Sequence, residues 1–194
     1  MIIRNYLPED EQGWLRCRVL AFLNTAYYDN VLNKKEHYDN PAIQLVAEID
    51  DVIVGLIDVE YELKEGTVCS RGQGLGGMIW HIAVHPDYAR RGIGEALLFA
   101  AEKEAQAKNL NRFEAWTRDD LWVRDWYKKM QFNQVYSYYH LFFEGAELDH
   151  RMNSLIPKLY PVTAFAHYLG DDIAQFDTIN RKHECICYEK YFGV

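Results

Sequence analysis

The residues best suited to chemistry lie in residues 79–98, where an apolar run ends in a turn and two glycines open a helix-like pattern. The first turn of a helix carries unpaired backbone N–H groups and a partial positive charge, which suit an anion. Gly92 and Gly94 lack the side chains that would keep a phosphate away from that backbone. Arg90 and Arg91 add positive charge to an otherwise acidic chain. The spacing therefore predicts a phosphate or pyrophosphate site at this turn.

A second glycine cluster, residues 72–77, fits the letters of a dinucleotide-binding fingerprint. That fingerprint follows a strand and opens a helix, whereas this cluster precedes an apolar strand, so we interpret it as a flexible loop. The chain contains neither a P-loop sequence nor the serine motif of a hydrolase nucleophile elbow.

Strand and helix patterns place the phosphate-binding turn inside an α/β chain. We expect strands at residues 2–4, 43–49, 52–63, 78–84, 112–117, 134–144 and 184–192. We expect helices from Asp10 to Leu23, from Gly94 to about Lys108, and from Asp119 or Asp120 through Met130. Residues 145–180 are mixed and interrupted by prolines. This alternation predicts a sheet with some parallel pairing and a right-handed crossover through the second helix.

Length and composition narrow the class of protein. With 194 residues, 49% hydrophobic and 26% charged, the chain has the composition of one folded domain and not of a disordered segment. Its net charge of −8 disfavours a nucleic-acid partner. No apolar run reaches the roughly 18 residues that span a membrane, and the first residues lack a signal-peptide pattern. We expect a cytoplasmic protein with no membrane partner.

The four cysteines have no paired spacing, so we expect neither a disulfide framework nor a zinc ribbon. His183, Cys185 and Cys187 would share one face of a strand, and such a set can bind a soft metal. A half-buried strand carrying small thiols explains the same residues. We expect no metal site.

Taken together, these segments resemble the acetyl-CoA-binding signature of the GNAT superfamily of N-acetyltransferases. The family pattern is an apolar strand ending L-x-V-x-P, followed by [Q/R]-x-x-G-x-[G/A], and the corresponding residues here are 82–86 (IAVHP) and 89–94 (ARRGIG). A second family element, a helix ending F-Y-x-K-x-G-F, is similar to residues 126–132 (WYKKMQF). The resemblance covers residues 1–144 in element order and is sharp in residues 79–98 and 120–132.

The resemblance implies a fold and an activity. The fold is a mixed, mostly antiparallel sheet with splayed central parallel strands and flanking helices, in one domain over residues 1–194. Its core is residues 1–144, and residues 145–194 form a C-terminal extension that contributes a last strand. The activity is transfer of the acetyl group of acetyl-CoA directly to a primary amine, without a cysteine nucleophile or a metal.

The resemblance also implies roles for particular residues. Tyr127 would be the general acid that protonates the departing CoA thiolate. The strand backbone would pair with the pantetheine arm and the turn would cradle the pyrophosphate; the residues concerned are Ile82, Ala83, Val84, Arg90, Arg91, Gly92, Ile93, Gly94 and Glu95. The chain departs from the pattern at Ala89, Asp120 and Gln131, where the family has Gln or Arg, Asn, and Gly. An ionised Asp120 cannot donate the hydrogen bond that an Asn would give to the pantetheine arm.

The sequence does not identify the general base, because Met78 stands where some family members place a Glu. Asp58, Glu60 and Glu62 alternate along one expected strand, as an acidic wall for a cationic amine or as a solvated strand face. Glu60 and His81 are the candidate bases, and a chain of water molecules is the alternative.

The acceptor is hardly constrained. Acidic and aromatic residues follow the first helix, where the family often builds its acceptor wall, and such groups suit an ammonium ion; they are Tyr27, Tyr28, Asp29, Glu36, Tyr38 and Asp39. A solvated loop explains them equally well. Residues 145–180 form an insertion, a lid or a dimerisation arm, so a homodimer is one expectation. The alternative functions are a non-catalytic acyl-CoA-binding or sensing module of the same fold, and a nucleotide-binding α/β protein that uses the same turn.

Overall fold

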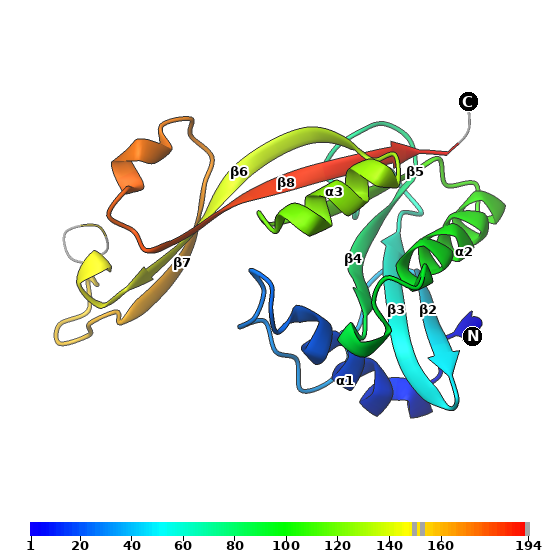
Figure 1. The fold of residues 1–194 in the computed structure, drawn as a ribbon. Helices are drawn as coiled ribbons and strands as arrows, with labels where there is room; N and C mark the ends of the chain where they lie inside the picture. The colour runs from blue at the N-terminus through cyan, green and yellow to red at the C-terminus, as the bar shows by residue number, and fades with distance from the viewer. Residues whose placement is uncertain (149–150, 152–153, 193–194) are drawn as a thin grey trace.

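Eight strands form one mixed sheet in the part of the chain that the structure, a computed structural model, describes: residues 1–148, 151 and 154–192 (Figure 1). They are β1 (Ile2–Asn5), β2 (Ala42–Ile49), β3 (Val52–Tyr61), β4 (Gly76–Val84), β5 (Arg112–Thr117), β6 (Asn133–Glu144), β7 (Thr163–Tyr168) and β8 (Arg181–Tyr191), and they lie in the order β1-β2-β3-β4-β5-β8-β6-β7. The helices are α1 (Glu11–Phe22), α2 (Ile93–Ala107) and α3 (Leu121–Lys129), with short 3₁₀ turns at Pro8–Asp10, Pro86–Tyr88, Gly145–Leu148 and Ile173–Phe176.

One pair of strands, β4 and β5, is parallel, and the other neighbouring pairs of the described sheet are antiparallel. The parallel register runs from Gly76 opposite Arg112 to Ile79 opposite Ala115. β4 then continues to Val84 without a partner on β5, while the end of β5 pairs with β8. The two central strands therefore diverge, which confirms the mixed sheet with splayed parallel strands.

The helices cover opposite faces of this sheet. Leu56 packs with Trp14 of α1, while its neighbour Ile57 packs with Leu97 of α2. Successive side chains of a strand point to opposite faces, so α1 and α2 lie on the two sides of β3 and β4. In this way α2 links β4 to β5 as a crossover, with its N-terminus at the end of β4 (Figure 1).

The outer end of the sheet differs from the prediction. β6 and β8 run together beyond the other strands, and β7 pairs with the outer half of β6 (Figure 1). The sequence pattern did not predict β7, because its inward side chains include the small Ala164 and Ala166, which give little apolar signal. They pack instead against larger residues contributed by β6, such as Leu141 and Phe143.

No helix among the described residues combines the length and the hydrophobicity needed to cross a membrane.

Candidate active site

The turn between β4 and α2 has the geometry of an anion cradle. Arg90 and Gly92 both adopt left-handed backbone conformations, with φ of 61° and 78°. α2 begins directly afterwards at Ile93, and its first helical hydrogen bond runs from the N–H of Ala96 to the carbonyl of Gly92. The N–H groups of residues 93–95 have no partner within the helix and are oriented towards the turn. Residues 89–92 are exposed, so an anion can reach these groups.

The start of α2 lies against β4 and α3. A side chain at Gly94 would place its Cβ 3.6 Å from Val84 Cγ2 and 3.6 Å from Trp126 Cζ2. Ala83 is buried on the α1 side of the sheet, whereas Ile82 and Val84 are partly buried among the residues packed on α2. The elements expected to hold the pantetheine arm and the pyrophosphate therefore meet at one place, beside the divergence of β4 and β5.

Glu95 and Arg91 lie at the margin of this cradle. The Glu95 carboxylate is 3.9 Å from Lys129 Nζ, a solvent-exposed pair of little energetic weight. The guanidinium of Arg91 lies 5.1 Å from the ring centroid of Tyr88 and donates a hydrogen bond to the carbonyl of Asp87 at 3.2 Å.

Tyr127 lies on α3, as expected, and faces inward. It is 4% exposed, and its ring stacks on Tyr188 with centroids 5.3 Å apart and meets the edge of Phe132. Burial raises the pKa of Tyr127 above the usual value for a phenol, so this side chain carries its proton at neutral pH.

The carboxylate of Glu60 is fully engaged. It accepts hydrogen bonds from the backbone N–H and the side-chain amide of Asn40, both at 2.9 Å, and from Trp80 Nε1 at 2.8 Å. Burial by itself raises the pKa of Glu60, but these hydrogen bonds outweigh it and leave the pKa below its usual value. Glu60 therefore binds protons weakly and holds a loop and a tryptophan in place.

His81 has both ring nitrogens occupied. Nδ1 lies 3.3 Å from Arg18 Nε, and Nε2 contacts the carboxylate of Glu36. Because an arginine N–H can only donate, Nδ1 accepts and the proton of the neutral ring lies on Nε2, facing Glu36. His81 thus presents no free lone pair to a substrate and orients Glu36 instead.

Arg18 is the main residue of this cluster that the sequence analysis missed. It is buried, and donates to the backbone and side-chain oxygens of Asn30 at 2.7 and 3.2 Å. Its guanidinium lies 4.6 Å from the ring centroid of Phe22. Burial lowers the pKa of Arg18. Its position four residues after Trp14, on the same helix face, is the signal that could have identified it.

The acidic residues of the β3 segment, two within the strand and one directly after it, are buried and do not form a solvated strand face. Asp58, Glu60 and Glu62 are all buried. Glu62 accepts hydrogen bonds from backbone N–H groups of the loop that follows, including those of Gly66 and Gly76 at 2.8 and 2.9 Å. The acidic row therefore organises the protein's own loops.

The residues expected to form an acceptor wall divide into two groups. In the first group, Asp29 makes two hydrogen bonds of 2.7 and 2.8 Å to Arg181, whose guanidinium also covers Tyr28. Tyr27 packs under Arg118 in the same way, at 4.2 Å. This part of the loop is therefore anchored to the ends of β5 and β8 by arginines.

In the second group, Glu36 and Tyr38 face the polar residues of β3 and β4, while Asp39 is exposed. Asp120, at the start of α3, accepts the backbone N–H of Ala26 at 3.0 Å and so connects α3 to the loop after α1.

The other departures from the family pattern have local consequences. Gln131 adopts the left-handed conformation, φ 66°, that the usual glycine would adopt without strain.

The residues of β8 that could bind a soft metal are separately engaged. His183 is 2.7 Å from Asp119, and Cys185 and Cys187 are buried on β8. Among the described residues, no group of three or more His, Cys, Asp or Glu is arranged to hold a metal ion.

The geometry defines the class of protein: an α/β fold with splayed parallel strands and an anion cradle at a helix N-terminus. Comparisons with known proteins place the chain in a family. The model of the Acetyltransferase (GNAT) family matches residues 4–132. The chain therefore belongs to the GNAT acetyltransferase family.

Curated relatives and solved structures agree with this assignment. An acetyltransferase of Pectobacterium atrosepticum is 30% identical over 140 residues, which span 70% of this chain and 89% of that protein. A GNAT-family acetyltransferase of Streptococcus pneumoniae has the same fold, with a TM-score of 0.61 and 15% identity over 98% of this chain and 99% of that one. An N-acetyltransferase of Thermoplasma acidophilum, solved in complex with coenzyme A, has a TM-score of 0.51 and 15% identity over 69% of this chain and 90% of that chain.

Proposed function

We propose that this protein transfers the acetyl group of acetyl-CoA directly to a primary amine. The observation that carries the proposal is the divergence of β4 and β5 beside the anion cradle at the start of α2. A thioester cofactor needs such an arrangement, with a strand edge for its amide-containing arm and helix N–H groups for its pyrophosphate. The complex of the Thermoplasma relative with coenzyme A supports the choice of cofactor.

In the proposed complex, the free edge of β4 at residues 82–84 pairs with the pantetheine arm like an added strand. Residues 90–95 hold the pyrophosphate, mainly through backbone N–H groups. The exposed guanidinium groups of Arg90 and Arg91 add charge at this site. Since the backbone supplies most of these contacts, Ala89 in place of Gln or Arg leaves the cradle functional.

The reaction itself requires two proton movements. The amine loses a proton and attacks the thioester carbonyl, the C–S bond breaks, and the CoA thiolate takes up a proton to leave as the thiol. In our proposal Tyr127 supplies that last proton, because it lies on the helix that packs against the start of α2 and a phenol is protonated at neutral pH.

The change Tyr127→Phe is expected to lower kcat by about a hundredfold, within the range of a general acid, with KM for acetyl-CoA nearly unchanged. The measurement is steady-state release of CoA with a reactive amine. Tyr188→Phe is the matched control, since it removes the buried hydroxyl of the ring stacked on Tyr127. Equal turnover in both variants and the wild type would remove Tyr127 from the mechanism.

The proposed proton acceptor is Glu36. Glu60 is occupied by three donors, and both nitrogens of His81 are engaged. Glu36, in contrast, is 44% exposed and contacts His81 through one carboxylate oxygen. Its contact with His81 keeps the pKa of Glu36 below the usual value despite partial burial, so it is ionised at neutral pH and passes protons on to solvent.

The variant Glu36→Gln is therefore expected to lower kcat/KM for the amine by about 10²-fold and to leave acetyl-CoA affinity intact. Because its hydrogen bond with His81 keeps the pKa of Glu36 below the usual value for a glutamate, protonation of Glu36 should cause no loss of activity as the pH falls from 8 to 6. Glu9→Gln, at an exposed position, is the control. A Glu36→Gln enzyme with wild-type kcat/KM would assign the proton transfer to water.

The experiment that tests the function as a whole compares thermal shifts with acetyl-CoA, CoA, NADPH and ATP, followed by a screen of amines for CoA release. A shift of about 5–10 °C with acetyl-CoA at a hundred times its Kd, together with CoA release, is the expected result. A shift without turnover for any amine would favour the acyl-CoA-binding module, which Met78 in the place of a Glu also favours. A shift with ATP or NADPH alone would overturn the proposal.

A further inference from the structure

Lys35 occupies an unusual environment in the loop between α1 and β2. Its Nζ lies 5.0 Å from each of the ring centroids of Tyr6, Trp14 and Tyr38. It also lies 2.5 Å from a carboxylate oxygen of Asp58. The side chains of Lys35 and Asp58 are 6% and 0% exposed, so the ammonium group is enclosed by three aromatic rings and one buried carboxylate.

The carboxylate of Asp58 is only half used. Its Oδ2 accepts from both Lys35 Nζ and the hydroxyl of Tyr38, the latter at 2.9 Å. Its Oδ1 is buried and has no hydrogen-bond partner among the described residues. An unpaired buried acceptor is costly, and a second N–H donor of an ammonium ion would satisfy it.

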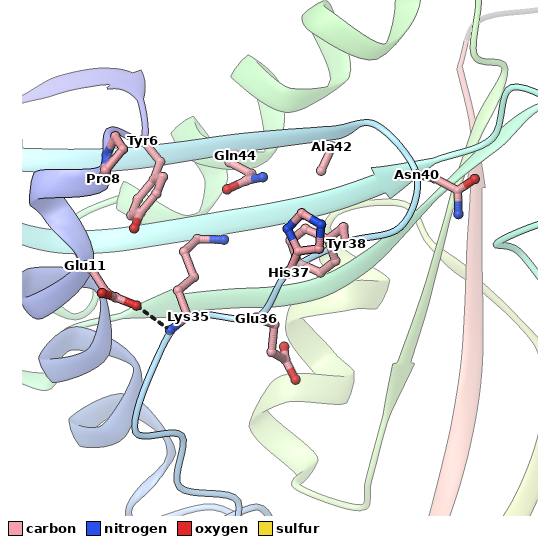
Figure 2. A pocket seen from close by; sticks show the side chains of 10 residues that line it. All are labelled: Tyr6, Pro8, Glu11, Lys35, Glu36, His37, Tyr38, Asn40, Ala42 and Gln44. Carbon is pink, nitrogen blue, oxygen red and sulfur yellow. Dashed lines mark hydrogen bonds between the residues drawn. The ribbon is translucent and has the colours of Figure 1, made fainter.

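A pocket of about 400 Å³ adjoins this cage. Tyr6, Lys35 and Tyr38 belong to both the cage and the pocket. Figure 2 shows the Lys35 side chain extending between Tyr6 on one side and Tyr38 on the other. Glu11 holds the loop by accepting the backbone N–H of Lys35 at 2.9 Å. The rest of the pocket is lined by Glu11 together with Pro8, Glu36, His37, Asn40, Ala42 and Gln44. Trp14 and Asp58 do not line this pocket, so the Lys35 side chain separates the pocket from the inner part of the cage.

We propose that Tyr6, Trp14, Tyr38 and Asp58 form a binding site for an organic primary ammonium ion, which Lys35 fills as a built-in ligand. Aromatic faces attract a cation through their quadrupoles, and a buried carboxylate neutralises its charge. A ligand that enters through the adjoining pocket takes over the position of the Lys35 ammonium group. The site is distinct from the acetyl-CoA cradle and does not depend on catalysis.

Exchange of Lys35 would also affect the segment that follows it, residues 35–40, which we call the strap. The strap is fastened to β3 and β4 by Lys35 and Tyr38 on Asp58, Glu36 on His81, and Asn40 on Glu60. Lys35 is the first residue of the strap and directly precedes Glu36. Displacing its side chain therefore detaches the end of the strap that adjoins Glu36. The consequence for turnover rests on the proposed function, whereas the binding site itself does not.

The first test removes the built-in ligand. Lys35→Ala deletes three methylene groups and the ammonium group, a fragment that n-propylammonium replaces. We expect Lys35→Ala to have a lowered Tm, and n-propylammonium at ten times its Kd to raise it by about 3–6 °C. The same concentrations of n-propanol and of NaCl serve as neutral and ionic controls, and Lys34→Ala, an exposed neighbour, as the control variant. Equal shifts with n-propanol and n-propylammonium would overturn the proposal, as would no shift with either.

The second test uses the wild-type chain and holds even if Lys35→Ala does not fold. Acylation of lysines by an N-hydroxysuccinimide ester of acetate, followed by peptide mass spectrometry, compares the buried Lys35 with the exposed Lys34. Lys35 is expected to react at least tenfold more slowly, and n-propylammonium is expected to raise the ratio of the Lys35 rate to the Lys34 rate, a ratio that does not depend on how much ester the added amine consumes. Equal reactivity of the two lysines, or a rate ratio that the cation leaves unchanged, would show that the position is not exchangeable. Neither test involves acetyl-CoA, so a negative result would overturn the ammonium site without bearing on the proposed acetyl transfer.

Discussion

Replacing Gly94 by Trp is expected to lower the affinity for acetyl-CoA at least about a hundredfold, while the thermal unfolding midpoint changes by only a few degrees. The Cβ of any residue at this position lies in ordinary contact distance of Val84 and Trp126, at 3.6 Å from each. An indole attached there extends over the first turn of α2, where the N–H groups of residues 93–95 would meet the pyrophosphate. Loss of several charge-assisted hydrogen bonds to a phosphate accounts for a change of this size.

Gly94→Ala is the matched control for this experiment, because a methyl group fits at 3.6 Å without displacing a neighbour and φ at this residue is not left-handed. It should bind acetyl-CoA nearly as well as the wild type. Isothermal titration with acetyl-CoA and with CoA measures both affinities. Wild-type affinity in Gly94→Trp would show that the pyrophosphate lies elsewhere.

The anion cradle could be predicted from the sequence because its determinants are local. A buried strand, a turn, two glycines and a helix follow one another within residues 79–98, and each imposes its geometry on the next. The left-handed Gly92 at the start of α2 is what such a glycine allows. The alternation of strands and helices around it predicted a sheet with some parallel pairing, and the family resemblance implied the mixed, splayed arrangement.

The polar cluster around His81 could not be predicted in the same way. Its contacts join residues far apart in the sequence, such as Arg18 with His81 and Lys35 with Asp58. Spacing identified Glu60 and His81 as polar residues on buried strands, but not that each would be occupied by the protein's own loop. Free lone pairs, and hence candidate bases, depend on tertiary contacts that no short pattern records.

The second glycine cluster illustrates the same limit. Residues 72–75 form a loop before β4, as expected, whereas Gly76 and Gly77 already belong to the strand, and these glycines have a packing role that the sequence did not reveal. A Cβ at Gly72 would lie 2.3 Å from Glu189 Oε1 and 2.8 Å from Arg112, and one at Gly76 would lie 3.1 Å from Arg112. The loop therefore depends on close approach to a buried arginine.

Arg112→Met is expected to destabilise the protein by about 3–5 kcal/mol, because it leaves buried carboxylates without a counter-charge. Arg112 is 1% exposed, and its Nη1 lies 2.9 Å from Glu189 and 3.4 Å from Glu114. It also stands at the closed end of the splay, where it pairs with Gly76 in the first register of β4 and β5. If the variant loosens the pairing of β4 with β5, it should also weaken the binding of acetyl-CoA at the place where these two strands diverge.

The destabilisation should depend on pH in a defined direction. Burial already raises the pKa of Glu189 while Arg112 lowers it, so removing the arginine raises that pKa further. A carboxyl whose pKa is raised by folding binds more protons in the folded protein than in the unfolded chain. The folded protein therefore loses stability as the pH rises above about 4.3, the pKa of a glutamate in the unfolded chain. Urea denaturation should accordingly give a larger deficit at pH 7 than at pH 5, relative to the wild type. Arg16→Met, at an exposed position on α1, is the control. A deficit below about 1 kcal/mol, or one equal at both pH values, would mean that the two carboxylates find other partners, and that the closed end of the splay does not depend on this arginine.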